Sequence, residues 1–121
     1  MIKAIKFVGV PVTDQQRALE FYTAKLGFRV ITDQPFDDNQ QWIELGIGLS
    51  GTGIALFTPP EQENRIGTFT GVSLVADDVT RTARELADKG VKFVQEPKKA
   101  DWGTSAIFAD PDGNQFVLSS G

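Results

Sequence analysis

Two stretches of the chain decide its fold: VPVTDQQRALEFYTAKLGFRV at residues 10–30 and LVADDVTRTARELADKGVKFV at residues 74–94. Each contains the end of an apolar strand, an acidic residue able to cap a helix, and a helix with one apolar face. Each then reaches a glycine and re-enters an apolar strand. Asp14 lies thirteen residues before Gly27, and Asp77 lies thirteen residues before Gly90. This shared order and spacing indicate an internal repeat of one structural unit.

Strand-like segments surround both predicted helices, because β-branched and apolar residues recur there between clusters of turn-forming residues. We expect strands at Ile2–Val12, Phe28–Gln34, Gln41–Ile47 and Thr52–Thr58 in the first half, and at Thr68–Ala76, Val91–Gln95, Thr104–Ala109 and Gln115–Ser119 in the second. Thr13 or Asp14 is expected to cap the first helix, and Asp77 or Asp78 the second. The pattern predicts an α+β fold of two tandem β-α-β-β-β modules.

The 121 residues are expected to form a single domain, with module one at 1–58, a polar linker at 59–67 and module two at 68–121. One module of this size is too small to bury both its helix and its sheet alone, whereas two together can. The open sheet edges of such modules also favour a symmetric partner, so we expect a homodimer.

Composition excludes several classes of chemistry. The chain contains no cysteine and no histidine, so it has no disulfide, no thiolate metal site and no His-based catalytic triad. Its formal charge of −4, without a basic cluster, argues against nucleic acid and anionic membranes as partners. The sequence has neither a signal-peptide pattern nor a membrane-spanning apolar run, so we expect a soluble cytoplasmic protein.

Two segments carry a family resemblance: VPVTDQQRALEFYTAKLGF at residues 10–28 and WGTSAIFADPDGNQFVL at residues 102–118. Together with the repeat, they resemble the vicinal oxygen chelate superfamily of glyoxalase I, bleomycin resistance protein and the extradiol dioxygenases. The resemblance covers essentially the whole chain. It implies that the modules form a curved, half-open mixed sheet whose concave face holds the functional site, while the reaction differs among members.

The resemblance also implies where metal-dependent members carry their ligands. The corresponding positions in this chain are Phe7, Gly71, Val117 and a position near Ala55. None of these side chains has a donor atom, so the residues predict no metal, no cofactor and no catalytic group at these positions. A metal site relocated to Glu44, Gln115 and Gln41 is the alternative, although one carboxylate with two amides binds divalent ions weakly.

The remaining residues of the predicted concave face describe an apolar cavity with a few polar groups, which is typical of a small-molecule site. Trp42 and Glu44 share one strand face, since side chains alternate along a strand. The candidate ligand-binding residues are Phe7, Trp42, Glu44, Phe57, Trp102, Gln115 and Val117.

These residues lead to three hypotheses. The first is a metal-independent, non-catalytic protein that sequesters a small organic molecule, aromatic or cationic and antibiotic-like, as the metal-free branch of the superfamily does. Glu44 and the acidic charge suit a cationic aromatic guest. The second is a metal-dependent lyase or dioxygenase of the superfamily with an atypical site. The third is a structural module whose concave face is filled by Phe7, Val72, Leu74 and Val117.

Overall fold

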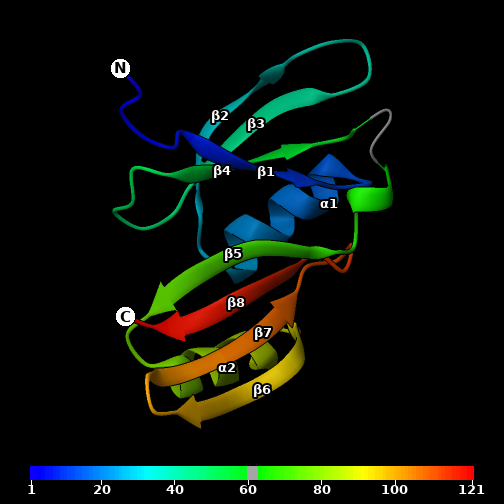
Figure 1. Cartoon of the computed structure of the whole chain (residues 1–121). Helices are drawn as coiled ribbons and strands as arrows, with labels where there is room; N and C mark the ends of the chain where they lie inside the picture. Colours follow the sequence, from blue (N-terminus) through cyan, green and yellow to red (C-terminus); the bar gives the residue numbers. More distant parts are fainter. Residues whose placement is uncertain (60–62) are drawn as a thin grey trace. The chain divides into compact units, whose positions relative to one another are not determined.

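The predicted repeat is present in the structure, a computed structural model that describes residues 1–59 and 63–121. The chain divides into two units, Met1–Ile66 and Gly67–Gly121. Each unit has a four-stranded mixed sheet and one α-helix, in the order strand, helix, strand, strand, strand (Figure 1). The prediction of an α+β fold with two tandem β-α-β-β-β modules is confirmed. No helix within the described ranges is both long and apolar enough to span a membrane.

The first unit builds its sheet in the strand order β1-β4-β3-β2. Strands β1 and β4, the first and the last of the unit in sequence, are neighbours and run parallel. Strand β3 is antiparallel to both β4 and β2. Its elements are β1 (Phe7–Pro11), α1 (Gln15–Glu20), the π-helical turn η1 (Phe21–Lys25), β2 (Arg29–Pro35), β3 (Gln41–Gly46), β4 (Gly53–Phe57) and the 3₁₀ turn η2 (Glu63–Arg65).

The helical segment formed by α1 and η1 begins and ends where the sequence predicts. The Asp14 side chain accepts a hydrogen bond from the Arg17 backbone N–H at 3.1 Å, and Gly27 follows the helical segment at φ +77°. Both features satisfy backbone groups that a helix end leaves open. The helical segment packs its apolar side on the sheet, and the buried core of this unit comprises Val10, Val12, Ala18, Phe21, Tyr22, Ile43, Leu45, Ile54, Ala55 and Leu56.

The first strand is shorter than the predicted Ile2–Val12, because β1 begins only at Phe7. The pairing of β1 with β4 starts at Phe7 and Gly53, and Gly53 is the first residue of β4. Before it, the Lys6 carbonyl oxygen accepts from the Gly53 N–H and the Ile5 carbonyl oxygen accepts from the Thr52 hydroxyl. Residues 2–6 therefore have no strand to pair with, and their apolar composition alone does not make them a strand.

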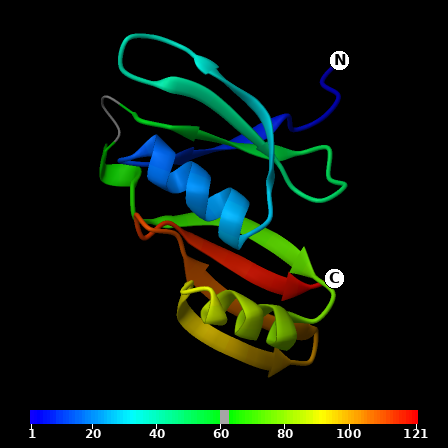
Figure 2. The ribbon, with the colours of Figure 1, turned by 180° about the vertical axis from the view of Figure 1, so that it is seen from behind.

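The second unit repeats the design with the strand order β5-β8-β7-β6. Helix α2 covers one face of this sheet (Figure 2). Its cap is Asp78, whose carboxylate accepts from the Arg81 N–H at 3.0 Å, and Gly90 ends it at φ +92°. The elements are β5 (Phe69–Ala76), α2 (Val79–Asp88), β6 (Lys92–Ala100), β7 (Gly103–Ala109) and β8 (Gln115–Ser120).

Strand β6 is longer than the predicted Val91–Gln95 and includes Pro97. It is the last strand of its sheet, where a missing N–H costs no ladder bond on the free edge. Its pairing with β7 continues to Ala100 and Gly103, with register shifts on the way. An edge position therefore permits a proline and two lysines that would argue against a central strand.

A buried polar turn joins β7 to β8. Asp110 and Asn114 are the buried polar residues of the described chain, with exposed fractions of 6% and 1%. The Asp110 carboxylate accepts from the N–H groups of Asp112 and Asn114 and from the Asn114 side-chain amide. Asn114 Oδ1 accepts from the Gly67 N–H at 2.8 Å. The turn therefore links the β7–β8 hairpin to the segment that enters β5.

Candidate functional site

A pocket of about 400 Å³ lies in the first unit, and we call it the aromatic pocket. Its volume falls in the range of sites that take small organic molecules. Most of its wall is apolar ring or methyl surface, with one amide and one guanidinium. The lining residues are Phe7, Gly9, Phe36, Gln40, Trp42, Ala55, Phe57 and Arg65.

Small residues form part of the wall between the rings. Gly9 on β1 and Ala55 on β4 are direct partners in the parallel pair. A Cβ atom on Gly9 would lie 3.0 Å from Cε1 of Phe57, closer than ordinary van der Waals contact. The missing side chain at Gly9 is therefore what allows the Phe57 ring to lie against the β1 backbone.

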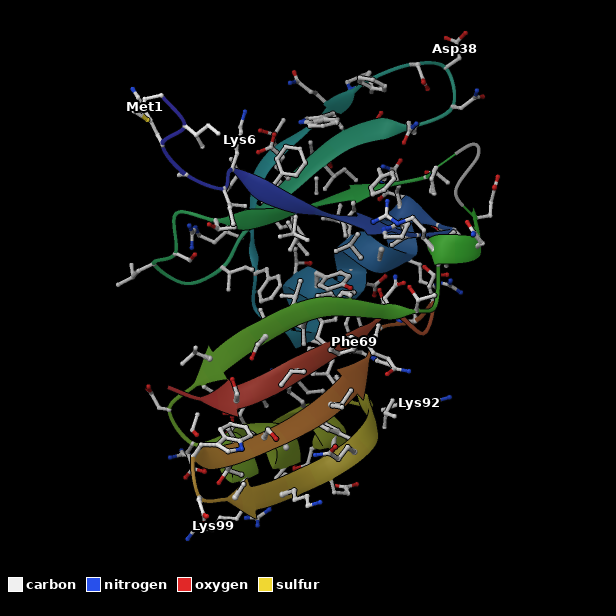
Figure 3. The ribbon with its side chains drawn as sticks, in the orientation of Figure 1. Met1, Lys6, Asp38, Phe69, Lys92 and Lys99 are labelled. Carbon is white, nitrogen blue, oxygen red and sulfur yellow. The ribbon has the colours of Figure 1, made fainter. Side chains whose placement is uncertain are left out.

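Trp42 contacts an aromatic ring on each of two other segments. Its centroid is 5.7 Å from that of Phe7 in an edge-on arrangement and 5.7 Å from that of Phe36 in a tilted one. Phe36 follows β2 in the hairpin whose tip carries Asp38 (Figure 3). Such rings offer flat, polarisable faces and edges for another planar ring. The arrangement is suited to stacking an aromatic ligand.

Glu44 lies beside Trp42 on β3, and its Oε1 accepts a hydrogen bond from the indole Nε1–H at 2.8 Å. Both side chains are half-buried on the same strand face. The carboxylate thereby gains a partner for its partly desolvated charge and fixes the rotation of the indole. Glu44 does not line the aromatic pocket itself; it orients a residue that does.

The structure brings three of the seven predicted ligand-binding residues into this pocket: Phe7, Trp42 and Phe57. Of the other four, Glu44 lies beside the pocket, bonded to Trp42, and three lie in the second unit, so they are not part of the pocket in the first. Trp102 is 68% exposed in the turn between β6 and β7. Gln115 and Val117 are half-buried on β8. Their role in ligand binding stays a prediction.

Sequence reasoning missed several lining residues. Gly9 had a usable signal, because it alternates with Phe7 along β1 and so shares its strand face. Phe36 and Gln40 lie in the connection between the predicted strands Phe28–Gln34 and Gln41–Ile47, and no local pattern shows where a side chain in such a connection points. Arg65 belongs to the short turn η2 near the end of the unit. Its place at the pocket depends on how the chain leaves β4, which no sequence period encodes.

The residues at the family's metal positions do not fit a metal ion. Phe7 and Ala55 place a ring and a methyl group in the aromatic pocket, and Gly71 and Val117 on β5 and β8 likewise offer no side-chain donor. No group of three or more aspartates and glutamates suited to a metal ion occurs among residues 1–59 and 63–121.

The alternative metal site predicted from the sequence, made of Glu44, Gln115 and Gln41, is not assembled in the structure either. Gln41 and Glu44 are three positions apart on β3, which places them on opposite faces of the sheet. The Gln41 side-chain amide donates to Asp33 Oδ1 at 3.1 Å, and Glu44 is engaged with the indole of Trp42. The two side chains therefore do not face a common point.

With this fold and pocket, the chain belongs to the Glyoxalase/Bleomycin resistance protein/Dioxygenase superfamily, whose family model matches residues 4–118. It is similar to the crystal structure of a superfamily member from Sphaerobacter thermophilus DSM 20745, with 32% identity, a TM-score of 0.90, and coverage of 99% of this chain and 98% of that one.

Two further similarities bear on function. The crystal structure of TnmS3, an antibiotic binding protein from Streptomyces sp. CB03234, is 31% identical with a TM-score of 0.87, covering 98% of this chain and 96% of that one. A probable lactoylglutathione lyase from Synechocystis sp. is 26% identical, covering 90% of this chain and 88% of that protein. One relative is described as a binding protein and the other as an enzyme.

Proposed function

We propose that the protein is a metal-independent binding protein that holds a planar aromatic, antibiotic-like molecule in the aromatic pocket. The observation that carries this proposal is the pocket itself: about 400 Å³ walled by Phe7, Phe36, Trp42 and Phe57. Rings of this kind bind a flat guest by burying its apolar faces and by stacking. A filled structural core would leave no such volume beside Phe7.

Charged and polar groups at the pocket would orient the guest rather than transform it. Gln40 contributes an amide and Arg65 a guanidinium to the lining, and the Glu44 carboxylate stands next to Trp42. A carboxylate has about four acceptor sites, of which the indole uses one. A cationic substituent on the guest would pair with the free side of Glu44.

Two comparisons weigh on the choice between binding and catalysis. TnmS3, described as an antibiotic binding protein, shares the fold at 31% identity, which supports binding. The likeness to a probable lactoylglutathione lyase favours a second candidate function, a metal-dependent lyase. Phe7, Gly71, Val117 and Ala55 supply no ligand at the family's metal positions, so we rank binding first.

Calorimetric titration with a panel of bleomycin-type and other aromatic natural products tests this ranking. We expect at least one compound to bind with a dissociation constant on the order of micromolar, as a rigid, mostly apolar contact allows. We expect the same affinity with excess EDTA. Failure of every compound to bind, or metal-dependent turnover of a hemithioacetal or catechol by tag-free protein, would overturn the proposal.

We also propose a homodimer. Strand β2 lies at the edge of the first sheet, and its residues Val30 and Ile31 are about half exposed. Strand β5 lies at an edge of the second sheet and exposes Phe69 and Val75. Exposed edges and apolar faces of this kind favour pairing with a symmetric copy. Size-exclusion chromatography with light scattering at micromolar concentration should give twice the mass of one chain. A single-chain mass would contradict the proposal.

A further inference from the structure

The ladder between β3 and β4 stops before the ends of the two strands, with Ile43–Leu56 as its last pair on the side of the hairpin tip. Three register pairs join them: Leu45–Ile54, Glu44–Ala55 and Ile43–Leu56. Continued by one step, the register would pair Trp42 with Phe57, yet no pair forms there. The β2–β3 hairpin instead diverges from β4 toward its tip (Figure 1). Both unpaired positions line the aromatic pocket.

The side chain of Gln15, the first residue of α1, takes over the hydrogen bonds that the ladder leaves open. Its Nε2 donates to the carbonyl oxygen of Gln41 at 2.8 Å and to that of Leu56 at 2.9 Å. Its Oε1 accepts from the Gln41 N–H at 2.9 Å. A primary amide has the same donors and acceptor as a peptide group, so it substitutes for a neighbouring strand.

Gln40 makes a second bridge across the same gap. Its Oε1 accepts from the Thr58 N–H at 3.0 Å, just beyond the end of β4. Its own backbone is held by the hairpin turn, where its N–H donates to Asp37 Oδ1 at 3.0 Å and its carbonyl oxygen accepts from the Phe36 N–H at 3.2 Å. Two carboxamides therefore connect the strands where backbone pairing is missing.

We propose that Gln15 and Gln40 are positioning residues that keep β3 and β4 apart and so hold the aromatic pocket open between Trp42 and Phe57. Without the Gln15 amide, the N–H and the carbonyl oxygen of Gln41, which are part-buried, lose this partner, which is costly. Direct pairing of the strands would satisfy them. Trp42 and Phe57 would then be cross-strand neighbours with Cβ atoms about 5 Å apart, and their rings would occupy the pocket.

The inference rests on the proposed function only in treating the pocket as a ligand site, and Gln15→Met tests it. Methionine keeps the length of the side chain and removes all three hydrogen bonds. Gln16→Met makes the same chemical change at an exposed neighbour on the same helix and serves as the control. The readouts are the affinity for N-phenyl-1-naphthylamine, a neutral aromatic probe, and hydrogen exchange at the Gln41 amide.

We expect Gln15→Met to weaken probe binding about tenfold, the equivalent of one to two net hydrogen bonds, and to change the exchange of the Gln41 amide. Gln16→Met should behave as the unaltered protein in both measurements. Where Gln15→Met does not fold, Gln15→Glu retains an acceptor for the Gln41 N–H but loses both donors to the carbonyls. It is expected to weaken the probe in the same direction.

The outcomes separate this inference from the proposed function. Probe affinity equal to that of the unaltered protein in both Gln15 variants would overturn the positioning role while leaving ligand binding intact. Absence of probe and panel binding in the unaltered protein would contradict the proposed function instead. In that case the structure of Gln15→Met decides the inference: a new backbone pair between Trp42 and Phe57 supports it, and an unchanged gap overturns it.

Discussion

Replacing Trp42 with alanine is expected to weaken the binding of a planar aromatic compound about a hundredfold, because removing a central aromatic anchor costs about 2–4 kcal/mol of binding free energy. Trp42 lines the pocket and contacts the rings of Phe7 and Phe36, so its loss removes a stacking surface and loosens two others. Isothermal titration calorimetry with a compound that binds the unaltered protein gives the two dissociation constants.

Leu49→Ala is the control for this variant, since Leu49 is a large apolar residue of the same unit that is fully exposed in a loop. It should leave the affinity unchanged. Trp42→Phe keeps a ring but loses the hydrogen bond to Glu44, so an intermediate affinity is expected. Equal affinities for Trp42→Ala and the unaltered protein would place the ligand elsewhere.

The Asp110→Ala variant is expected to lose about 4 kcal/mol of unfolding free energy, the sum of several charge-assisted hydrogen bonds in a buried turn. Asp110 Oδ1 accepts from the N–H groups of Asp112 at 3.0 Å and Asn114 at 2.8 Å, and Oδ2 accepts from Asn114 Nδ2 at 2.9 Å. Alanine leaves the two buried Asn114 donors and the part-buried Asp112 N–H without the carboxylate. Urea unfolding monitored by circular dichroism measures the difference.

Asp101→Ala provides the matched comparison, because Asp101 is exposed in the turn between β6 and β7. A change within about 0.5 kcal/mol is expected there, as for most surface substitutions. Asp110→Asn keeps one acceptor oxygen and should fall between the two. If Asp110→Ala were as stable as Asp101→Ala, the turn would not hold the hairpin as described.

The fold was predictable because its signals are local. Asp14 and Gly27 bound the first helical segment through contacts within one turn, and Gly90 ends the second in the same way. The thirteen-residue spacing from Asp77 to Gly90 does not run from cap to terminating glycine as it does from Asp14 to Gly27, since Asp78 is the residue that caps α2. Two adjacent aspartates have the same capping propensity in the sequence, and the backbone conformation decides which of them caps the helix.

The candidate site was less predictable because the pocket depends on where backbone pairing between β3 and β4 stops. Alternation along a strand correctly placed Trp42 and Glu44 on one face, but no period shows that the indole donates to the carboxylate. Nor does any local pattern show that β3 pairs with β4 only from Ile43 onward, leaving Gln41 and Trp42 outside the ladder. In the sequence, Gln15 is an ordinary residue in the first turn of a helix. Its bridging role is visible only in the structure, where its side chain bonds to the backbone of Gln41.

Chemical-shift mapping with the compound that binds tightest tests the central claim, that the aromatic pocket holds the ligand. We predict saturable shifts at the indole N–H of Trp42 and at ring protons of Phe7 and Phe57, unchanged by EDTA. Tight binding that leaves these three residues unperturbed would contradict the account.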